Sequence, residues 1–122
     1  MKHWDIVILE DDEDLGEMIR MILAIHNYRI LHYTNAKECM AAIAELKPRM
    51  MIMDMLLSGA DGRLLCRDLK NNPTTRNIGI ILMSAHPDAA QGCLQAGADA
   101  FVQKPFDIDE LRRQVHILFT SL

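Results

Sequence analysis

The sequence predicts a doubly wound α/β domain, in which helices cover both faces of one parallel sheet. Short apolar runs alternate along the chain with segments whose apolar residues recur at helical spacing. Several of the short runs are apolar without alternation, as expected for strands that are buried on both faces. Five strand–helix units in 122 residues leave room for a single domain, residues 1–122, with one sizeable core.

Five short runs have the length and composition of strands. They are Ile6–Leu9, Arg29–Tyr33, Met50–Met53, Gly79–Met83 and Ala100–Val102. The first, third and fourth contain no polar side chain, which indicates that they occupy the covered part of the sheet.

Five helices are predicted, each from apolar residues three or four positions apart. The sets are Leu15, Met18, Ile19 and Ile22; Ala36, Cys39, Met40 and Ile43; Gly62, Leu65, Cys66 and Leu69; Ala90, Cys93, Leu94 and Gly97; and Ile108, Leu111, Val115 and Leu118. Local signals predict the helix ends through caps, proline and glycine. The signals are Asp14 with Glu17, Asp107 with Glu110, and Pro87 at helix starts, and Pro48 and Gly97 at helix ends.

Composition excludes several classes of function. The net charge is −4 and the basic residues are scattered, so we expect no direct binding to nucleic acid. The chain shows no signal peptide and no apolar run of membrane-spanning length, which predicts a cytoplasmic protein. Cys39, Cys66 and Cys93 have no metal-binding or CxxC spacing, and we expect buried, reduced thiols.

Acidic residues stand where two predicted strands end. The run Glu10–Asp14 follows the first strand directly, and Asp54 closes the third. A charge run is usually a solvated face, and a lone aspartate can simply cap a turn. However, a carboxylate among apolar residues costs desolvation energy unless a cation pairs with it. Because parallel strands end at the same edge, Glu10, Asp11 and Asp54 are expected to converge on a cation. Oxygen ligands without histidine or cysteine favour Mg²⁺ over zinc.

Two further strand ends carry polar groups that suit a phosphate. Ser84 follows the fourth strand, and its hydroxyl could bind a phosphate oxygen. Lys104 follows the fifth, and its mobile charge suits a carboxylate and then a phosphoryl group. The Lys104-Pro105 bond is a candidate for a cis peptide. Taken alone, Ser84 would be interpreted as a strand-end cap and Lys104 as a solvated side chain. Together with the three carboxylates, these two residues favour phosphoryl transfer.

With these residues in place, the chain resembles the receiver domain of two-component response regulators over residues 5–119. The matching segments are Ile8–Asp12, Met53–Met55, Gly59–Gly62, Met83–Ala85 and Gly97–Phe106. The resemblance implies a flavodoxin-like sheet with strand order 2-1-3-4-5. It also implies a function: the domain accepts a phosphoryl group from the phosphohistidine of a histidine kinase or phosphotransfer protein, and switches conformation to signal to an effector that the sequence does not identify.

The resemblance assigns a role to each strand-end residue. Asp54 is the nucleophile that is phosphorylated, and Glu10, Asp11, Asp54 and the backbone carbonyl of Leu56 bind Mg²⁺. Lys104 contacts the phosphoryl group, Ser84 moves to bond it, and Phe101 turns inward after the hydroxyl moves. Such a domain is not a conventional enzyme, because it catalyses its own phosphorylation and dephosphorylation. Without the resemblance, Phe101 would read as an ordinary core residue.

The sequence departs from the family pattern near the acceptor. Ser58 stands where the family usually has proline, so the loop is expected to be less rigid. Ala85 leaves access to the acceptor open. His86, Met55 and Leu56 are expected to tune dephosphorylation, in a direction that the sequence leaves open.

Two other functions compete with phosphorylation as interpretations of these residues. A pseudo-receiver would signal by protein contact alone, but the set Glu10, Asp11, Asp54, Ser84 and Lys104 is intact. A haloacid-dehalogenase-type phosphatase would need a second aspartate two residues after the nucleophile, where this chain has Leu56.

The last predicted helix offers a possible output or dimer surface. Arg112, Arg113 and His116 lie off its apolar stripe, and Phe119 is expected to be partly exposed. A mixed basic and apolar face beside Phe101 would suit a homodimer or an effector, although ordinary surface residues explain it equally well. Whether the chain is a stand-alone regulator or part of a larger protein stays open.

Overall fold

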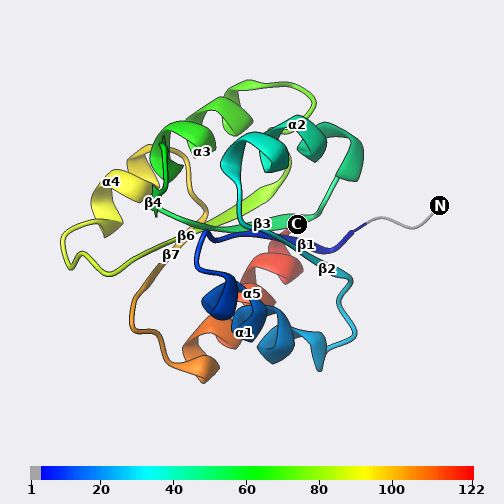
Figure 1. The fold of residues 1–122 in the computed structure, drawn as a ribbon, viewed down its shortest axis with the longest axis vertical. Coiled ribbons are helices and arrows are strands. Elements are labelled where there is room, and N and C mark those ends of the chain that lie inside the picture. Colours follow the sequence, from blue (N-terminus) through cyan, green and yellow to red (C-terminus); the bar gives the residue numbers. More distant parts are fainter. Residues whose placement is uncertain (1–3) are drawn as a thin grey trace.

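Five parallel strands form the central sheet of the computed structural model, which describes residues 4–122 (Figure 1). They are β1 (Ile6–Leu9), β2 (Ile30–Tyr33), β3 (Met50–Asp54), β6 (Gly79–Ser84) and β7 (Ala100–Gln103). Their order in the sheet is β2-β1-β3-β6-β7, which confirms the predicted order 2-1-3-4-5. Residues 1–3, which belong to the N-terminus predicted to be too short for a signal peptide, lie outside the described part.

Five helices form the two outer layers. They are α1 (Glu13–Ala24), α2 (Ala36–Leu46), α3 (Gly62–Asn71), α4 (Ala90–Gln95) and α5 (Ile108–Ser121). Figure 1 shows α1 and α5 on one face of the sheet and α2, α3 and α4 on the other. Within residues 4–122, no helix has the length and apolar character needed to cross a membrane.

Each face of the sheet has its own apolar cluster. On β1, Val7 and Leu9 pack with the α2–α4 layer, whereas Ile6 and Ile8 pack with α1 and α5. All four side chains are fully buried, because successive residues of a strand point to opposite faces and helices cover both. This explains why the central strands lack an alternating pattern in the sequence.

A short antiparallel hairpin, which is not among the elements predicted from the sequence, follows β3. Its strands are β4 (Leu56–Leu57) and β5 (Ala60–Asp61). Gly59 turns the chain between them with a φ of +76°, a conformation that side chains with a Cβ rarely adopt. The hairpin connects the end of β3 to the start of α3, and its turn contacts the loop after β1 through the backbone N of Ser58, which donates to Asp11.

The helix ends agree in part with the predictions. The prediction for α1 was wrong by two residues: Asp12 is the N-cap and accepts from the backbone N of Leu15 at 3.1 Å, while Asp14 lies inside the first turn. Because β1 ends at Leu9, α1 can begin at Glu13, within the acidic run, and Asp12 is then the last residue before the helix. Pro87 lies in a turn before α4, which begins only at Ala90, so its predicted place in the first helical turn was also wrong.

Other predicted ends are confirmed. Asp107 caps α5, although Glu110 bonds Gln114 and Arg113 instead of completing a capping box. Gly97 follows α4 with a φ of +106°.

The apolar stripes of the helices were placed correctly but were narrower than predicted. Met18, Leu94 and Ile108 are 44–50% exposed because they lie at the edges of their stripes. Phe119 is buried, contrary to the expectation that it is partly exposed. Its ring stacks on Tyr28, with centroids 4.6 Å apart, and the guanidinium of Arg49 lies 4.5 Å from its centroid.

All three cysteines are free and buried on the α2–α4 side of the sheet, as predicted. Burial raises the pKa of Cys39 to about 12 and that of Cys66 to about 11. The thiols therefore stay protonated and pack as small apolar side chains.

Candidate functional site

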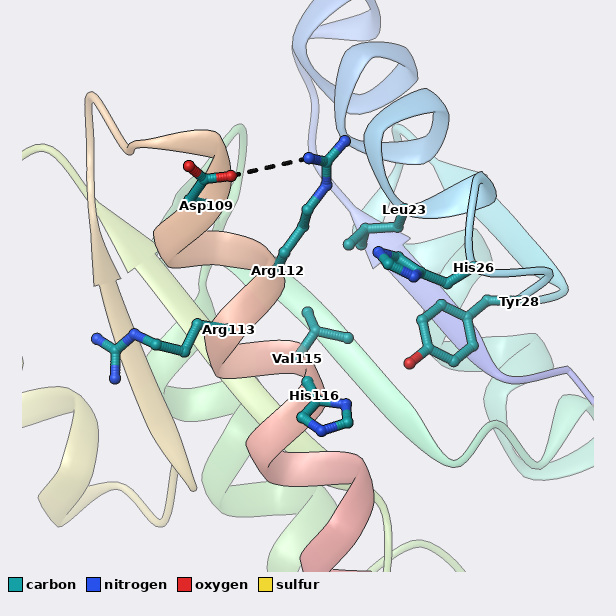
Figure 2. A pocket seen from close by; sticks show the side chains of 8 residues that line it. All are labelled: Leu23, His26, Tyr28, Asp109, Arg112, Arg113, Val115 and His116. Atoms are coloured by element: carbon teal, nitrogen blue, oxygen red, sulfur yellow. Dashed lines mark ion pairs between the residues drawn. The ribbon is translucent and has the colours of Figure 1, made fainter.

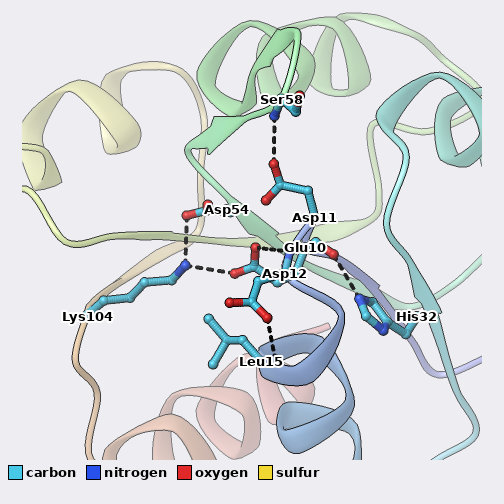
Figure 3. A network of polar contacts seen from close by, with 8 residues as sticks. All are labelled: Glu10, Asp11, Asp12, Leu15, His32, Asp54, Ser58 and Lys104. Carbon is cyan, nitrogen blue, oxygen red and sulfur yellow. Dashed lines mark hydrogen bonds and ion pairs between the residues drawn. The ribbon is translucent and has the colours of Figure 1, made fainter.

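Three carboxylates meet at the carboxyl ends of β1 and β3 (Figure 3). These strands pair directly, with Leu9 opposite Met53, so the next residues lie side by side: Glu10 follows β1 and Asp54 is the last residue of β3. Glu10 is 1% exposed and Asp54 is 9% exposed, whereas Asp11 is exposed. One oxygen from each carboxylate lies within 4.8 Å of the others. The predicted convergence of the three acids is confirmed.

Lys104 reaches this acidic cluster from the end of β7. Its Nζ donates to Oε1 of Glu10 at 2.7 Å and lies 3.2 Å from Oδ1 of Asp54. Figure 3 shows the ammonium between these two carboxylates. The backbone N of Lys104 donates to the carbonyl of Ser84, and the Lys104-Pro105 peptide is cis, as considered above.

Burial and charge shift the pKa values of this group. Desolvation raises the pKa of Asp54 and of Glu10, although the nearby Lys104 opposes the shift in both. For Lys104, burial acts to lower the pKa, but the hydrogen bond to Glu10 and the charge of Asp54 outweigh it, and the pKa is raised. The positive charge of Lys104 therefore does not fully offset the cost of burying the two carboxylates, whereas the ammonium of Lys104 stays protonated.

Backbone donors hold the acidic loop after β1. The backbone N of Asp12 donates to Oε2 of Glu10 at 3.2 Å. The backbone N of Ser58, from the β4–β5 turn, donates to Oδ2 of Asp11 at 2.8 Å. Nothing in the sequence predicts the Ser58 contact, because a backbone donor leaves no signal in the residue type.

His32 makes a further contact with this loop. Its Nε2 lies 2.9 Å from the carbonyl oxygen of Glu10. No sequence signal marked it, since an isolated histidine in a strand is usually an ordinary half-buried residue.

The donor set fits a hard divalent cation. Carboxylate oxygens are the ligands that Mg²⁺ prefers. Three carboxylates and one ammonium leave two negative charges uncompensated, which matches one Mg²⁺. Leu56, whose carbonyl was predicted as a further ligand, begins β4 two residues after Asp54.

Ser84 and Phe101 lie outside the acidic cluster. Ser84 ends β6 and is buried, and its Oγ accepts from the backbone N of His86 at 3.0 Å. Phe101 lies on β7 and is half-buried against the α2–α4 cluster. Their predicted movements stay predictions.

A hollow of about 300 Å³ lies between the end of α1 and α5, away from the acidic cluster (Figure 2). Arg112, Arg113 and His116 line it together with His26 and Tyr28. The end of the Arg113 side chain points away from the other lining residues in Figure 2 and pairs with Glu110. The three basic residues that were predicted to lie off the apolar stripe of α5 therefore border one hollow, and the predicted place of this face beside Phe101 stays a prediction. None of the strand-end carboxylates lines this hollow.

Comparisons with known proteins agree with this geometry. The family model described as response regulator receiver domain matches residues 6–116. The chain is 35% identical over 109 residues to the phosphate regulon transcriptional regulatory protein PhoB of Pseudomonas aeruginosa, covering 87% of this chain and 47% of that protein. It is 29% identical over 112 residues to the DNA-binding response regulator MtrA of Mycolicibacterium smegmatis, covering 90% and 48%. The chain thus spans about half the length of these relatives.

Solved structures have the same fold. A response regulator from Chloroflexus aurantiacus superposes with a TM-score of 0.91 at 29% identity, covering 98% of this chain and 99% of that one. The signal receiver domain of a histidine kinase from Syntrophus aciditrophicus gives 0.88 at 31% identity, covering 98% and 92%. Phosphorylation-driven switching is the general function of such domains. By its fold, its strand-end residues and these matches, the chain belongs to the response regulator receiver domain family.

Proposed function

We propose that residues 1–122 form one receiver domain that accepts a phosphoryl group on Asp54. One observation carries the proposal: a nearly buried aspartate ends a central strand, 3.2 Å from an ammonium and beside two further carboxylates. A solvated acidic surface would not require a lysine between its members. An Asp nucleophile with a pre-placed cation suits attack on phosphorus.

The proposed chemistry is an in-line transfer from a phosphohistidine. An oxygen of Asp54 attacks the phosphorus, the P–N bond breaks, and the imidazole nitrogen keeps the electron pair and takes up a proton. Lys104 then exchanges its carboxylate partner for a phosphoryl oxygen. Mg²⁺ held by Glu10, Asp11, Asp54 and the Leu56 carbonyl would neutralise charge on the transferred group.

The proposed phosphodonor is a histidine kinase or phosphotransfer protein, which implies a cytoplasmic location. An apolar groove of about 460 Å³ lies beside Lys104 and supports this partner. It is lined by Leu15, Met18, Lys104, Pro105, Phe106 and Ile108. Met18 and Ile108 are each 44% exposed, so a helix that presents a phosphohistidine could pack there and face Asp54.

The acyl phosphate is proposed to act as a switch. Ser84 would leave the backbone N of His86 to bond a phosphoryl oxygen, and Phe101 would then repack inward. A downstream effector would read the new surface.

Phosphorylation with acetyl phosphate and Mg²⁺ tests the proposal. Wild type should gain one phosphoryl group, which is lost under acyl-phosphate hydrolysis conditions, and Asp54→Asn should gain none. Asp68→Asn, an exposed aspartate on α3, is the matched control and should label fully. Undiminished labelling of Asp54→Asn would contradict the assignment. A wild type that no donor phosphorylates would instead favour a pseudo-receiver.

A Mg²⁺ titration tests the proposed ligands separately. Asp11→Ala should weaken Mg²⁺ binding and slow phosphorylation together, because it removes one carboxylate of the cluster. Asp14→Ala removes an acid from the same run but from the first turn of α1, and it should bind Mg²⁺ as wild type does. Superimposable curves for Asp11→Ala and wild type would mean that the acidic run is a solvated face.

A further inference from the structure

We infer that His32 is a positioning residue that orients the peptide joining Glu10 and Asp11, and so aims the carboxylate of Asp11. The inference rests on the proposed function, since it concerns two proposed Mg²⁺ ligands. It is carried by a contact, by a space built for the ring, and by the way the rest of the loop is held.

The contact has a defined direction. His32 Nε2 lies 2.9 Å from the carbonyl oxygen of Glu10. A carbonyl oxygen only accepts hydrogen bonds, so Nε2 carries the proton and donates. Figure 3 shows the ring approaching Glu10 from β2, on the opposite side from Lys104.

Helix α1 leaves room for the ring at Gly16. A Cβ built there would lie 2.0 Å from Nε2 and 2.1 Å from Cε1 of His32, far inside any real contact. Gly16 is buried in the first half of α1, where glycine destabilises a helix by about 1 kcal/mol relative to alanine. The missing side chain is thus explained by the imidazole that fills its place.

The histidine completes the restraint of one peptide. The backbone N of Glu10 donates to the carbonyl of Tyr33, so the sheet holds the residue on that side. Beyond it, Asp12 and Ser58 donate to the carboxylates of Glu10 and Asp11, not to the main chain. His32 binds the carbonyl of the Glu10–Asp11 peptide, whose rotation would swing the Cα and carboxylate of Asp11 away from Asp54.

Nuclear magnetic resonance of three variants tests this role. His32→Leu keeps the volume but loses the donor, His32→Gln keeps a donor near the Nε2 position, and His26→Leu removes an exposed histidine as a control. Loss of one neutral hydrogen bond should weaken Mg²⁺ binding by about three- to tenfold in His32→Leu. His32→Gln should recover to within about twofold of wild type, and His26→Leu should match wild type.

Gly16→Ala perturbs the same contact from the helix side. It should displace the intact ring and weaken Mg²⁺ binding as His32→Leu does. In a His32→Ala background, where the space is open, Gly16→Ala should cause no further weakening. Equal losses from Gly16→Ala in both backgrounds would contradict the shared contact.

Spectra without Mg²⁺ separate this inference from the proposed function. The amide ¹⁵N signal of Asp11 should shift in His32→Leu and return in His32→Gln, because that amide shares a peptide with the Glu10 carbonyl. A wild type without saturable Mg²⁺ binding would refute the proposed ligands, and the Asp11 signal would still decide the role of His32. An unmoved Asp11 amide, or equal Mg²⁺ affinity of His32→Leu and wild type, would overturn the inference, as would equal losses in His32→Leu and His32→Gln.

Discussion

At the scale of single residues, Lys104 serves as the internal counter-charge of the acidic cluster. Its ammonium contacts Glu10 and Asp54, which are almost entirely buried. Removing one partner of a buried ion pair leaves a desolvated charge, which destabilises more than the pair itself stabilised. The lysine therefore contributes to folding as well as to the proposed chemistry.

Lys104→Met should lower the free energy of unfolding without Mg²⁺ by about 2–3 kcal/mol, because two carboxylates lose their partner. Saturating Mg²⁺ should recover part of that loss, since a cation that binds the folded state stabilises it. Urea denaturation with and without Mg²⁺ measures both effects. Lys37→Met, at an exposed position on α2, is the control. Equal stability of Lys104→Met and wild type without Mg²⁺ would contradict the counter-charge role.

The residues at the strand ends could be predicted, but their supports could not. Asp54 and Lys104 stand out because a charged residue that follows an apolar strand needs an explanation. His32 gives no such signal, because its partner is a backbone carbonyl and its space comes from a glycine in a different element. Ser58 likewise acts through its backbone N. Contacts to the main chain depend on geometry, not on residue type.

At the scale of elements, the N-cap of α2 is a testable source of stability. Asn35 accepts from the backbone N of Glu38 at 2.9 Å. Asn35→Ala should cost about 1 kcal/mol of unfolding free energy, whereas Asn35→Asp should change it by only a few tenths, because aspartate caps equally well. Urea denaturation at neutral pH measures the difference. Equal losses in both variants would show that the cap is not the cause.

The start of α3 predicts a pH dependence. Asp61 caps this helix through the backbone N of Arg63, and hydrogen bonds from the Arg63 side chain lower the pKa of Asp61. A lowered folded-state pKa adds stability above the unfolded pKa, and this stability is lost as the pH falls through the folded value. Asp61→Asn keeps a cap but loses the charge, so it should be less stable than wild type at pH 7.

Denaturation midpoints across pH check this expectation. The gap between wild type and Asp61→Asn should shrink as the pH falls below about 4, the ordinary pKa of aspartate. Asp68→Asn, at an exposed position on the same helix, controls for a general effect of charge. A gap of the same size at all pH values would rule out the ionised carboxylate as its source.

The elements also show where periodicity fails as a guide. Helical spacing found the buried face of α5, but it could not predict that Phe119 is covered. That burial comes from Tyr28 and Arg49, which approach from other parts of the chain. In the same way, Asp12 and Asp14 both suit an N-cap, and the choice depends on where β1 stops. The edges of the apolar stripes and the choice of cap residue depend on tertiary packing, whereas the alternation of strands and helices can be predicted from the local sequence.

At the scale of the whole molecule, a buried contact connects the segment after Asp54, the proposed acceptor, to α4. Met55 follows Asp54, and the thiol of Cys93 on α4 donates to its sulfur at 3.6 Å. Helix α4 has six residues and no side-chain cap at its start, so it is held weakly by its own sequence. A change at Asp54 can therefore be transmitted to α4 and to the neighbouring strand β7.

Beryllofluoride, which mimics a phosphoryl group on Asp54, should shift amide signals of residues 85–101 and of α5. The expected reason is that Ser84 and Phe101 repack and alter the α4–β7–α5 face. Leu94 and Ile117 are about half exposed on α4 and α5, so a partner or a second copy could bind there. Heteronuclear spectra measure the shifts, with Asp54→Asn as the control. Shifts confined to the loops that touch Asp54 would mean that the face is not coupled.

The three buried cysteines allow the opening of α2, α3 and α4 to be measured helix by helix. Cys39, Cys66 and Cys93 lie on α2, α3 and α4, one to each helix, and all face the same apolar cluster. A thiol reagent can reach each sulfur only when its helix detaches from the sheet, so the rate of modification reports the opening free energy of that helix. Mass spectrometry of the modified peptides would resolve the three sites. The native cysteines would thus report which helix loosens when the proposed phosphoryl group is on Asp54.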